Sequence, residues 1–172
     1  MAKPDSSPFR SSFLRAWWPA LVWIGLIAIE STDALSSNNT GDVLYRLISR
    51  LFPAVNLHDV LVLNFILRKT GHVMGYGILS LLLLRGWRRT LARARATFGR
   101  STVGLVTFGR TATLAWLGTA LIASMDEWHQ SFIPSRTGTP RDVLLDSTAG
   151  LVFLLVAYFW LRRNRMAEVP FQ

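Results

Sequence analysis

Long apolar segments separated by charged residues restrict this chain more than any other feature. The apolar residues are clustered instead of following the period of a soluble amphipathic helix, which is typical of a membrane protein. A hydrocarbon core of about 30 Å needs roughly 20 helical residues, so the first and third segments reach this length only when neighbouring polar residues extend them. The sequence predicts an all-α, polytopic membrane protein, a bundle of four transmembrane helices at about residues 13–32, 60–84, 111–130 and 140–161.

The composition agrees with one compact membrane domain and excludes other classes. The chain has 172 residues, of which 51% are hydrophobic and 17% charged, and it has no cysteine, so disulfides and thiolate metal sites are excluded. Its net charge of +9 could suggest nucleic-acid binding, but the basic residues lie between the apolar segments and not on one soluble face. We therefore expect no nucleic-acid partner.

The distribution of Lys and Arg predicts the orientation in the membrane. Both terminal tails and the basic linker 85–110 together hold thirteen basic residues and two acids, whereas the other two loops hold six basic residues and eight acids. By the positive-inside rule, both termini and the linker are cytoplasmic, and residues 126–146 face outward from the plasma (inner) membrane. Alternatively, the first segment is a signal peptide cleaved near Ala34, but Trp17, Trp18 and Trp23 suit an interfacial anchor better.

The first outer loop contains a helical pattern of its own. Apolar residues recur there at helical spacing: Val43, Leu44, Leu47, Ile48 and Leu51. Arg46 and Arg50 lie on the opposite face, and Thr40 or Asn39 is placed to cap the start. This pattern predicts a short interfacial helix that lies in the outer interface of the membrane.

Ionisable residues stand at one depth in all four predicted spans. The inner end of each span is marked by an arginine: Arg15, Arg85, Arg110 or Arg162. Glu30 lies 15 residues from its arginine, and Lys69, Asp126 and Asp146 each lie 16 residues from theirs. At ~1.5 Å per residue, all four reach about 22–24 Å from the inner face. Because charge inside a membrane is costly and marks function by default, we expect a shared site near the outer leaflet.

The spacing within each span predicts one polar face that points into the bundle. The three faces are Lys69, His72 and Tyr76; Asp126, His129 and Gln130; and Asp142 and Asp146. Thr139 and Pro140 have the residue types of an N-cap and first helical residue, so Asp142 could serve only the helix start. Arg136 either pairs with Glu127 or Asp142 to hold the loop, or binds an anion.

Three motifs that contain these residues resemble the VanZ-like family of small integral membrane proteins. They are Arg68-Lys69-x-x-His72-x-x-x-Tyr76, Asp126-Glu127-x-His129-Gln130-x-Phe132-x-Pro134-x-Arg136 and Asp142-Val143-x-x-Asp146-x-x-Gly150. Ser135 and Asp146 depart from the usual Gly and Asn of that pattern. The resemblance covers the last three spans and implies a single four-helix domain over residues 1–172, associated with the cell envelope. It also implies a link to glycopeptide resistance, notably to teicoplanin, as in the founding member.

Several functions fit such a site. An enzyme would act on a lipid-linked or phosphate-bearing envelope substrate, with candidate acid–base residues Asp126, Glu127, His129 and His72. The candidate substrate-binding residues are Lys69, Tyr76, Gln130, Arg136, Asp142 and Asp146. Alternatively, the protein is a non-enzymatic binder that recognises a lipid headgroup or shields it from an antibiotic, or a structural partner protein. The expected partners are therefore membrane lipid and a lipid-linked envelope intermediate or a glycopeptide.

The sequence gives little support for a metal site. His72, His129 and the carboxylates have ligand types that suit zinc or magnesium. However, the chain has no ligand spacing such as His-Glu-x-x-His, and it has no phosphate-cradling loop. The sequence alone therefore predicts no metal and no other cofactor.

Overall fold

The chain is all-α, as its apolar segments predict. In the computed structural model, the described residues 8–99 and 107–167 form five α-helices and one short 3-10 helix. They are α1 (Pro8–Glu30), η1 (Asp33–Leu35), α2 (Ser37–Leu51), α3 (Leu57–Phe98), α5 (Phe108–Gln130) and α6 (Pro140–Ala167). The separate helix expected in the first loop is present as α2.

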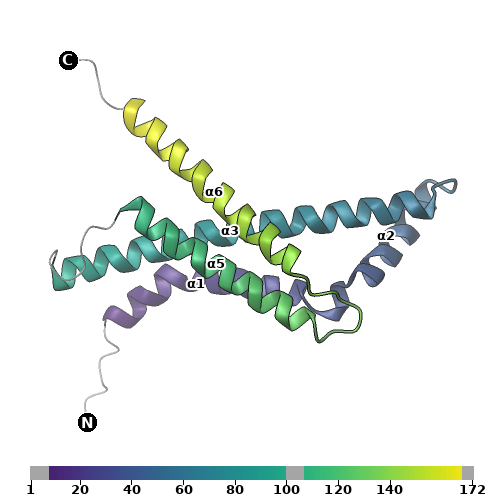
Figure 1. The fold of residues 1–172 in the computed structure, drawn as a ribbon, viewed down its shortest axis with the longest axis horizontal. Helices are drawn as coiled ribbons and strands as arrows, with labels where there is room; N and C mark the ends of the chain where they lie inside the picture. Colours follow the sequence, from purple (N-terminus) through teal and green to yellow (C-terminus); the bar gives the residue numbers. More distant parts are fainter. Residues whose placement is uncertain (1–7, 100–106, 168–172) are drawn as a thin grey trace, which may run out of the picture.

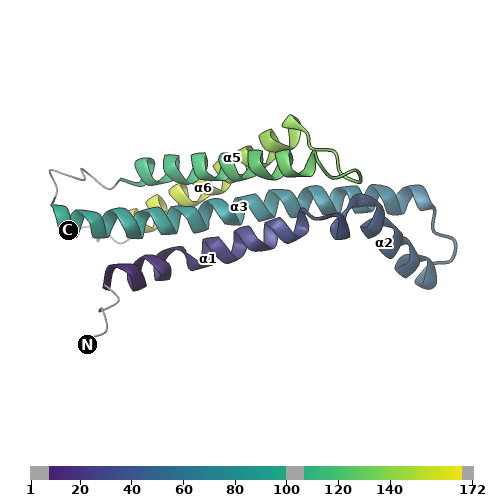
Figure 2. The same cartoon turned by 90° about the horizontal axis from the view of Figure 1, so that it is seen from below.

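The long helix α3 forms the centre of the arrangement (Figures 1 and 2). Helices α5 and α6 pack against α3 and against each other, α1 packs along α3, and α2 contacts its N-terminal part. The chain reverses direction between α1, α3, α5 and α6, so the start of α1 lies at the same end as the end of α3 (Figure 2). The end of α5 and the start of α6 therefore meet the middle of α3.

Helix α3 is longer than the sequence pattern predicts. It has 42 residues and continues from Arg85 to Phe98, where a linker was expected. Residues 100–106 of that linker lie outside the described residues. Alanine, leucine and arginine between residues 91 and 96 favour the helix, and Gly99 ends it with a φ of 81°, a conformation that favours glycine. Contacts with α1 hold this extension, because Trp17 Nε1 donates to Thr90 Oγ1 at 2.9 Å.

Polar side chains define the helix starts. The predicted N-cap of α6 is confirmed, because Thr139 Oγ1 accepts a hydrogen bond from the Asp142 N–H at 3.3 Å. The predicted cap of α2 is wrong. Ser36 caps that helix by accepting from the Asn39 N–H, three to four residues earlier than the expected cap, and η1 directly precedes it.

Small side chains let α3, α5 and α6 cross closely. Ser80 on α3 and Thr119 on α5 are completely buried. A Cβ added to Gly150 of α6 would lie 3.0 Å from Thr119 Cγ2 and 3.4 Å from Ser80 Cβ. Small residues at such crossings are typical of membrane bundles. The close crossing brings the polar faces of the three helices within hydrogen-bonding distance.

Two of the described helices contain a segment that is long and apolar enough to cross a membrane. The segments are Phe13–Glu30 of α1 and Pro140–Asn164 of α6. Helices α3 and α5 have polar side chains within their apolar stretches. Within the described ranges, neither contains a segment that meets the same standard of length and apolar composition. The bundle of four transmembrane helices, and the place of α2 in the membrane interface, therefore stay predictions.

Candidate functional site

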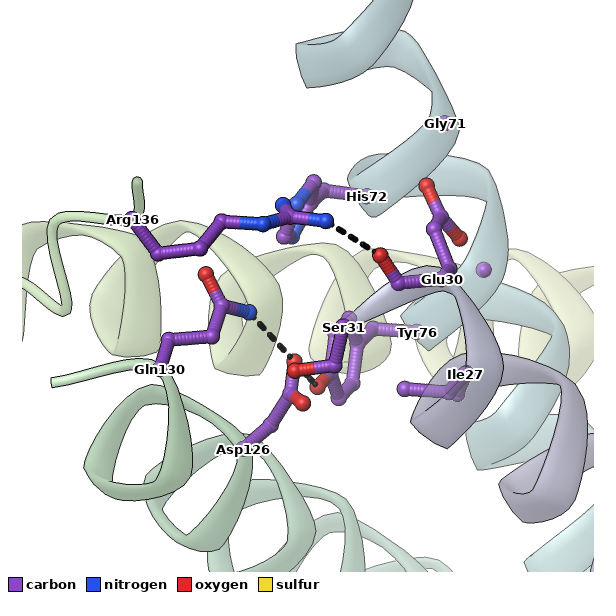
Figure 3. Close-up of a pocket in the computed structure, with 10 residues that line it drawn as sticks. Ile27, Glu30, Ser31, Gly71, His72, Tyr76, Asp126, Gln130 and Arg136 are labelled. Atoms are coloured by element: carbon purple, nitrogen blue, oxygen red, sulfur yellow. Dashed lines mark hydrogen bonds between the residues drawn. The ribbon is translucent and has the colours of Figure 1, made fainter. Parts of the chain in front are cut away.

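Polar side chains from α3, α5 and the loop after α5 meet at the end of α1 (Figure 3), and Asp146 of α6 joins them. Tyr76 donates from its hydroxyl to Asp126 Oδ2 at 2.9 Å, and the Gln130 amide donates to the same oxygen at 3.1 Å. His72 Nδ1 lies 3.2 Å from Asp146 Oδ2, and Asp146 is completely buried. The structure therefore joins five of the candidate residues in one cluster.

A second pair lies next to this cluster and is more open. Lys69 Nζ forms an ion pair with Asp142 Oδ1, and their side chains are 34% and 22% exposed. The Lys69 ammonium also lies 5.8 Å from the centre of the Phe65 ring. Both charged groups are therefore partly exposed, unlike the completely buried Asp146.

Two cavities adjoin the cluster. The inner cavity, of about 10 Å³, has room for roughly one water molecule and is lined by Glu30, Tyr76 and Asp126 among others (Figure 3). The outer cavity has a volume of about 150 Å³, and its charged lining residues are Arg68, Lys69, Arg136 and Asp142. His72 and Arg136 line both cavities.

Arg136 holds the loop between α5 and α6 against the end of α1. Its Nη2 donates to the backbone carbonyls of Glu30 and Thr32, the latter at 2.8 Å, and the side chain is buried. Of the two expected roles, it does hold the loop, but in the described part of the chain it does so through backbone carbonyls and not through an ion pair with Glu127 or Asp142. The last carbonyls of a helix lack intrahelical partners and attract positive charge, which explains this choice. Burial lowers the pKa of Arg136, but arginine remains charged in proteins.

Glu127 points toward α6 and not into the inner cavity. Its Oε2 accepts a hydrogen bond from the Thr139 N–H at 2.8 Å, and the side chain is buried. Its Oε1 has no hydrogen-bond partner, and neither has Oδ1 of Asp146. One ligand atom each from His72, Glu127 and Asp146 lies within 4.8 Å of the others, so these three residues are placed to hold a metal ion.

His129 lies away from this cluster, although the sequence spacing grouped it with Asp126 and Gln130. It is exposed and lines a largely apolar groove between α1 and α5, beside Ile24 and Ile122. At about 100° per residue, Asp126, Gln130 and Glu127 span an arc of about 100°, and His129 lies about 60° outside it. The face that enters the cluster therefore includes Glu127 in place of His129.

Sequence reasoning missed the contacts that hold the first loop beside the site. Arg68 Nη1 donates to the Leu35 carbonyl at 2.7 Å, and Asn64 Nδ2 donates to the Ser37 carbonyl at 3.1 Å. The Ser135 hydroxyl donates to Asp33 Oδ1. Two of these donors bind backbone carbonyls, which every residue has, so the sequence does not mark their partners. The position of Arg68 next to the candidate residue Lys69 was the one sign that it lies near the site.

The fold and the cluster define a class of small all-α proteins whose apolar helices enclose ionisable side chains. The model of the VanZ/LLP1 family matches residues 16–162, so the chain belongs to this membrane-associated family. The match confirms the resemblance of the three motifs and extends it to most of α1. No curated protein and no solved structure matches the chain.

Proposed function

We propose that this chain binds the phosphate-bearing headgroup of a membrane lipid or lipid-linked envelope molecule. The observation that carries this proposal is the outer cavity, where Arg68, Lys69 and Arg136 face a single lining carboxylate, Asp142. Arginine and lysine donate charge-assisted hydrogen bonds to phosphate oxygens, and a partly dry cavity strengthens such contacts. A headgroup of this kind therefore complements the excess positive charge of the cavity lining.

We propose that the chain spans the plasma (inner) membrane four times, with both termini in the cytoplasm. The basic residues that flank the apolar segments support this orientation. Large apolar side chains on α1, α5 and α6, such as Leu21, Leu121 and Val156, are exposed in the isolated chain and suit contact with lipid. In this orientation the outer cavity lies near the extracytoplasmic face, where α2 would lie along the interface and a headgroup of the outer leaflet could enter.

Lys69 is the cation most available to such a ligand. Arg68 and Arg136 already donate to backbone carbonyls, at Leu35 and at Thr32 respectively. Lys69 pairs with Asp142, and both are partly exposed. A phosphate would therefore take the place of the Asp142 carboxylate beside Lys69, and Asp142 acts as a competitor for the ligand.

Because Lys69 and Asp142 act in opposite ways, their substitutions should change ligand affinity in opposite directions. Lys69→Gln should weaken binding of a polyprenyl phosphate to the purified protein in detergent by roughly tenfold, since one charge-assisted hydrogen bond is lost. Asp142→Asn should strengthen binding, because it removes the competing charge. Arg141→Gln, an exposed neighbour with the same loss of charge as Lys69→Gln, is the matched control. Equal effects of Lys69→Gln and Arg141→Gln, or weaker binding by Asp142→Asn, would contradict the proposal.

A second candidate function is acid–base catalysis on the bound molecule. One observation favours it: His72 lines both cavities and its ring nitrogen is held by the buried Asp146 carboxylate. A histidine oriented in this way is suited to move a proton at a ligand in the outer cavity. The buried carboxylate of Glu127 and the half-buried carboxylate of Asp126 would support it. His72→Gln would then abolish turnover while leaving lipid binding intact. His129→Gln would change neither turnover nor lipid binding.

The family resemblance leads us to propose a role in glycopeptide resistance as well. Expression of the chain in a susceptible bacterium should raise the teicoplanin concentration needed to stop growth. If the headgroup site is responsible, Lys69→Gln should remove this effect and Arg141→Gln should keep it. A binder that shields the headgroup should tolerate His72→Gln, whereas an enzyme should not. A structural partner protein would tolerate all three changes as long as it accumulates in the membrane.

A further inference from the structure

We infer that His72, Glu127 and Asp146 bind a divalent transition-metal ion between α3, α5 and α6. One ligand atom of each residue lies within 4.8 Å of the other two. An imidazole nitrogen with carboxylate oxygens is a donor set that suits zinc and related ions, and three protein ligands leave a further position for water or a ligand oxygen. The ion would add a cofactor to the proposed headgroup site, but its binding does not depend on the headgroup.

Unpartnered oxygens point to a cation at this place. Glu127 is 4% exposed and Asp146 is 0% exposed. In each residue one carboxylate oxygen has a donor, because Glu127 Oε2 receives the Thr139 N–H and Asp146 Oδ2 faces His72 Nδ1. The other oxygen of each, Oε1 and Oδ1, is buried without a hydrogen-bond partner. Buried carboxylate oxygens normally have partners, and a metal ion between the two residues would supply one for both.

The cationic side chains that line the adjoining cavities are engaged elsewhere. Lys69 pairs with Asp142, and Arg136 donates to the carbonyls of Glu30 and Thr32. The neighbouring Asp126 already receives the hydroxyl of Tyr76 and the amide of Gln130. The negative charge of Glu127 and Asp146 is therefore balanced only by His72 in the described part of the cluster, and an added cation would complete the balance.

The spacing of the three residues is close to that of a metal site. Ligands of one zinc ion lie about 2.0–2.2 Å from it, so two of them are at most roughly 4.4 Å apart. His72 Nδ1 and Asp146 Oδ2 are 3.2 Å apart, within this limit, and a metal ion bound at Nδ1 would replace the hydrogen bond that now joins them. The ligand atoms of all three residues lie within 4.8 Å of one another, so side-chain shifts of a few tenths of an ångström would close the remaining gap. No rearrangement of the helices is required.

Metal binding is tested with the full chain, purified in detergent without a polyhistidine tag. Zinc and manganese are supplied singly, and bound metal is measured by elemental mass spectrometry and by titration against a chromophoric chelator. We expect about one ion per chain. Glu127→Gln and Asp146→Asn should each weaken binding by roughly 100-fold, because changes in the shell of a metal site already cost 10–100-fold. Glu30→Gln and His129→Gln, in the same layer but outside the three ligands, should leave affinity unchanged.

A second measurement guards against variants that simply unfold. Zinc should raise the midpoint of thermal unfolding of the unmodified protein and of Glu30→Gln, but not that of Glu127→Gln. The inference would be overturned if the protein bound neither ion, or if Glu127→Gln and Asp146→Asn bound metal as well as the unmodified protein. Either result would indicate that the carboxylates share protons with His72 in a metal-free network. Because no lipid is present in these measurements, that result would leave the headgroup proposal standing.

Discussion

Arg136 Nη2 donates a hydrogen bond to the backbone carbonyl of Thr32 at 2.8 Å and joins two loops that are 104 residues apart in the sequence. The same guanidinium also reaches the carbonyl of Glu30, the last residue of α1. The contact places the loop after α5 over the end of the first helix. Arg136 also lines both cavities. The shape of the site therefore depends on a side chain whose hydrogen bonds go to backbone carbonyls.

Loss of Arg136 should therefore reduce stability, whatever its effect on ligand binding. Arg136→Ala leaves carbonyls at the end of α1 without donors, and hydrogen bonds to a charged group contribute about 1.5–3 kcal/mol. We expect the midpoint of thermal unfolding of the protein in detergent to fall by roughly 3–10 °C. Arg141→Ala removes an exposed arginine from the next helix and should change it little. Equal midpoints for the two variants would contradict this role of Arg136.

Gly138 should tolerate no side chain. A Cβ at this position would lie 2.2 Å from the backbone oxygen of Glu127 and 2.9 Å from the backbone nitrogen of Ser131, so the loop would have to move. Gly138→Ala should lower the unfolding midpoint and shift Thr139 away from Glu127. Gly25→Ala is the contrasting change, because a Cβ there meets nothing within 4 Å. In helix α1 it should add up to about 1 kcal/mol. Comparable midpoints for the two variants would refute the close approach.

Tyr76 and Asp126 should be energetically coupled. Tyr76 is 2% exposed and donates to Asp126 Oδ2, so Tyr76→Phe removes one donor from this half-buried carboxylate. We expect a loss of about 1–3 kcal/mol, measured as a lower unfolding midpoint. In combination with Asp126→Asn, the loss should be smaller than the sum of the single changes. Tyr158→Phe, a change in a more exposed tyrosine, serves as the control. Additive losses would show that the hydrogen bond contributes nothing.

Much of the polar cluster could be predicted because helical geometry fixes which side chains share a face. His72 and Tyr76 of α3 do meet Asp146 of α6 and Asp126 of α5, as the spacing indicates. The start of α6 was predictable for a similar reason, since a threonine cap acts within one turn. These features depend on local periodicity, which a sequence displays directly.

Other parts of the site could not be predicted, and each has a physical cause. Arg136 binds main-chain carbonyls, and every residue has one, so no residue type marks the partner. The choice of Glu127 over His129 depends on the rotation of α5 by a few tens of degrees, which close packing at Thr119 and Gly150 sets. The length of α3 beyond Arg85 depends on its packing against α1, where Trp17 contacts Thr90 from a distant part of the chain.

The proposed orientation can be tested by cysteine labelling, because the native chain has no cysteine. Ser131 at the end of α5 and Thr97 near the end of α3 are both exposed, and the proposed topology puts them on opposite sides of the membrane. In intact cells or spheroplasts, a membrane-impermeant maleimide should label Ser131→Cys. It should label Thr97→Cys only after the membrane is opened. The reverse pattern would place the site on the cytoplasmic side, and labelling of both in intact cells would contradict a membrane between them.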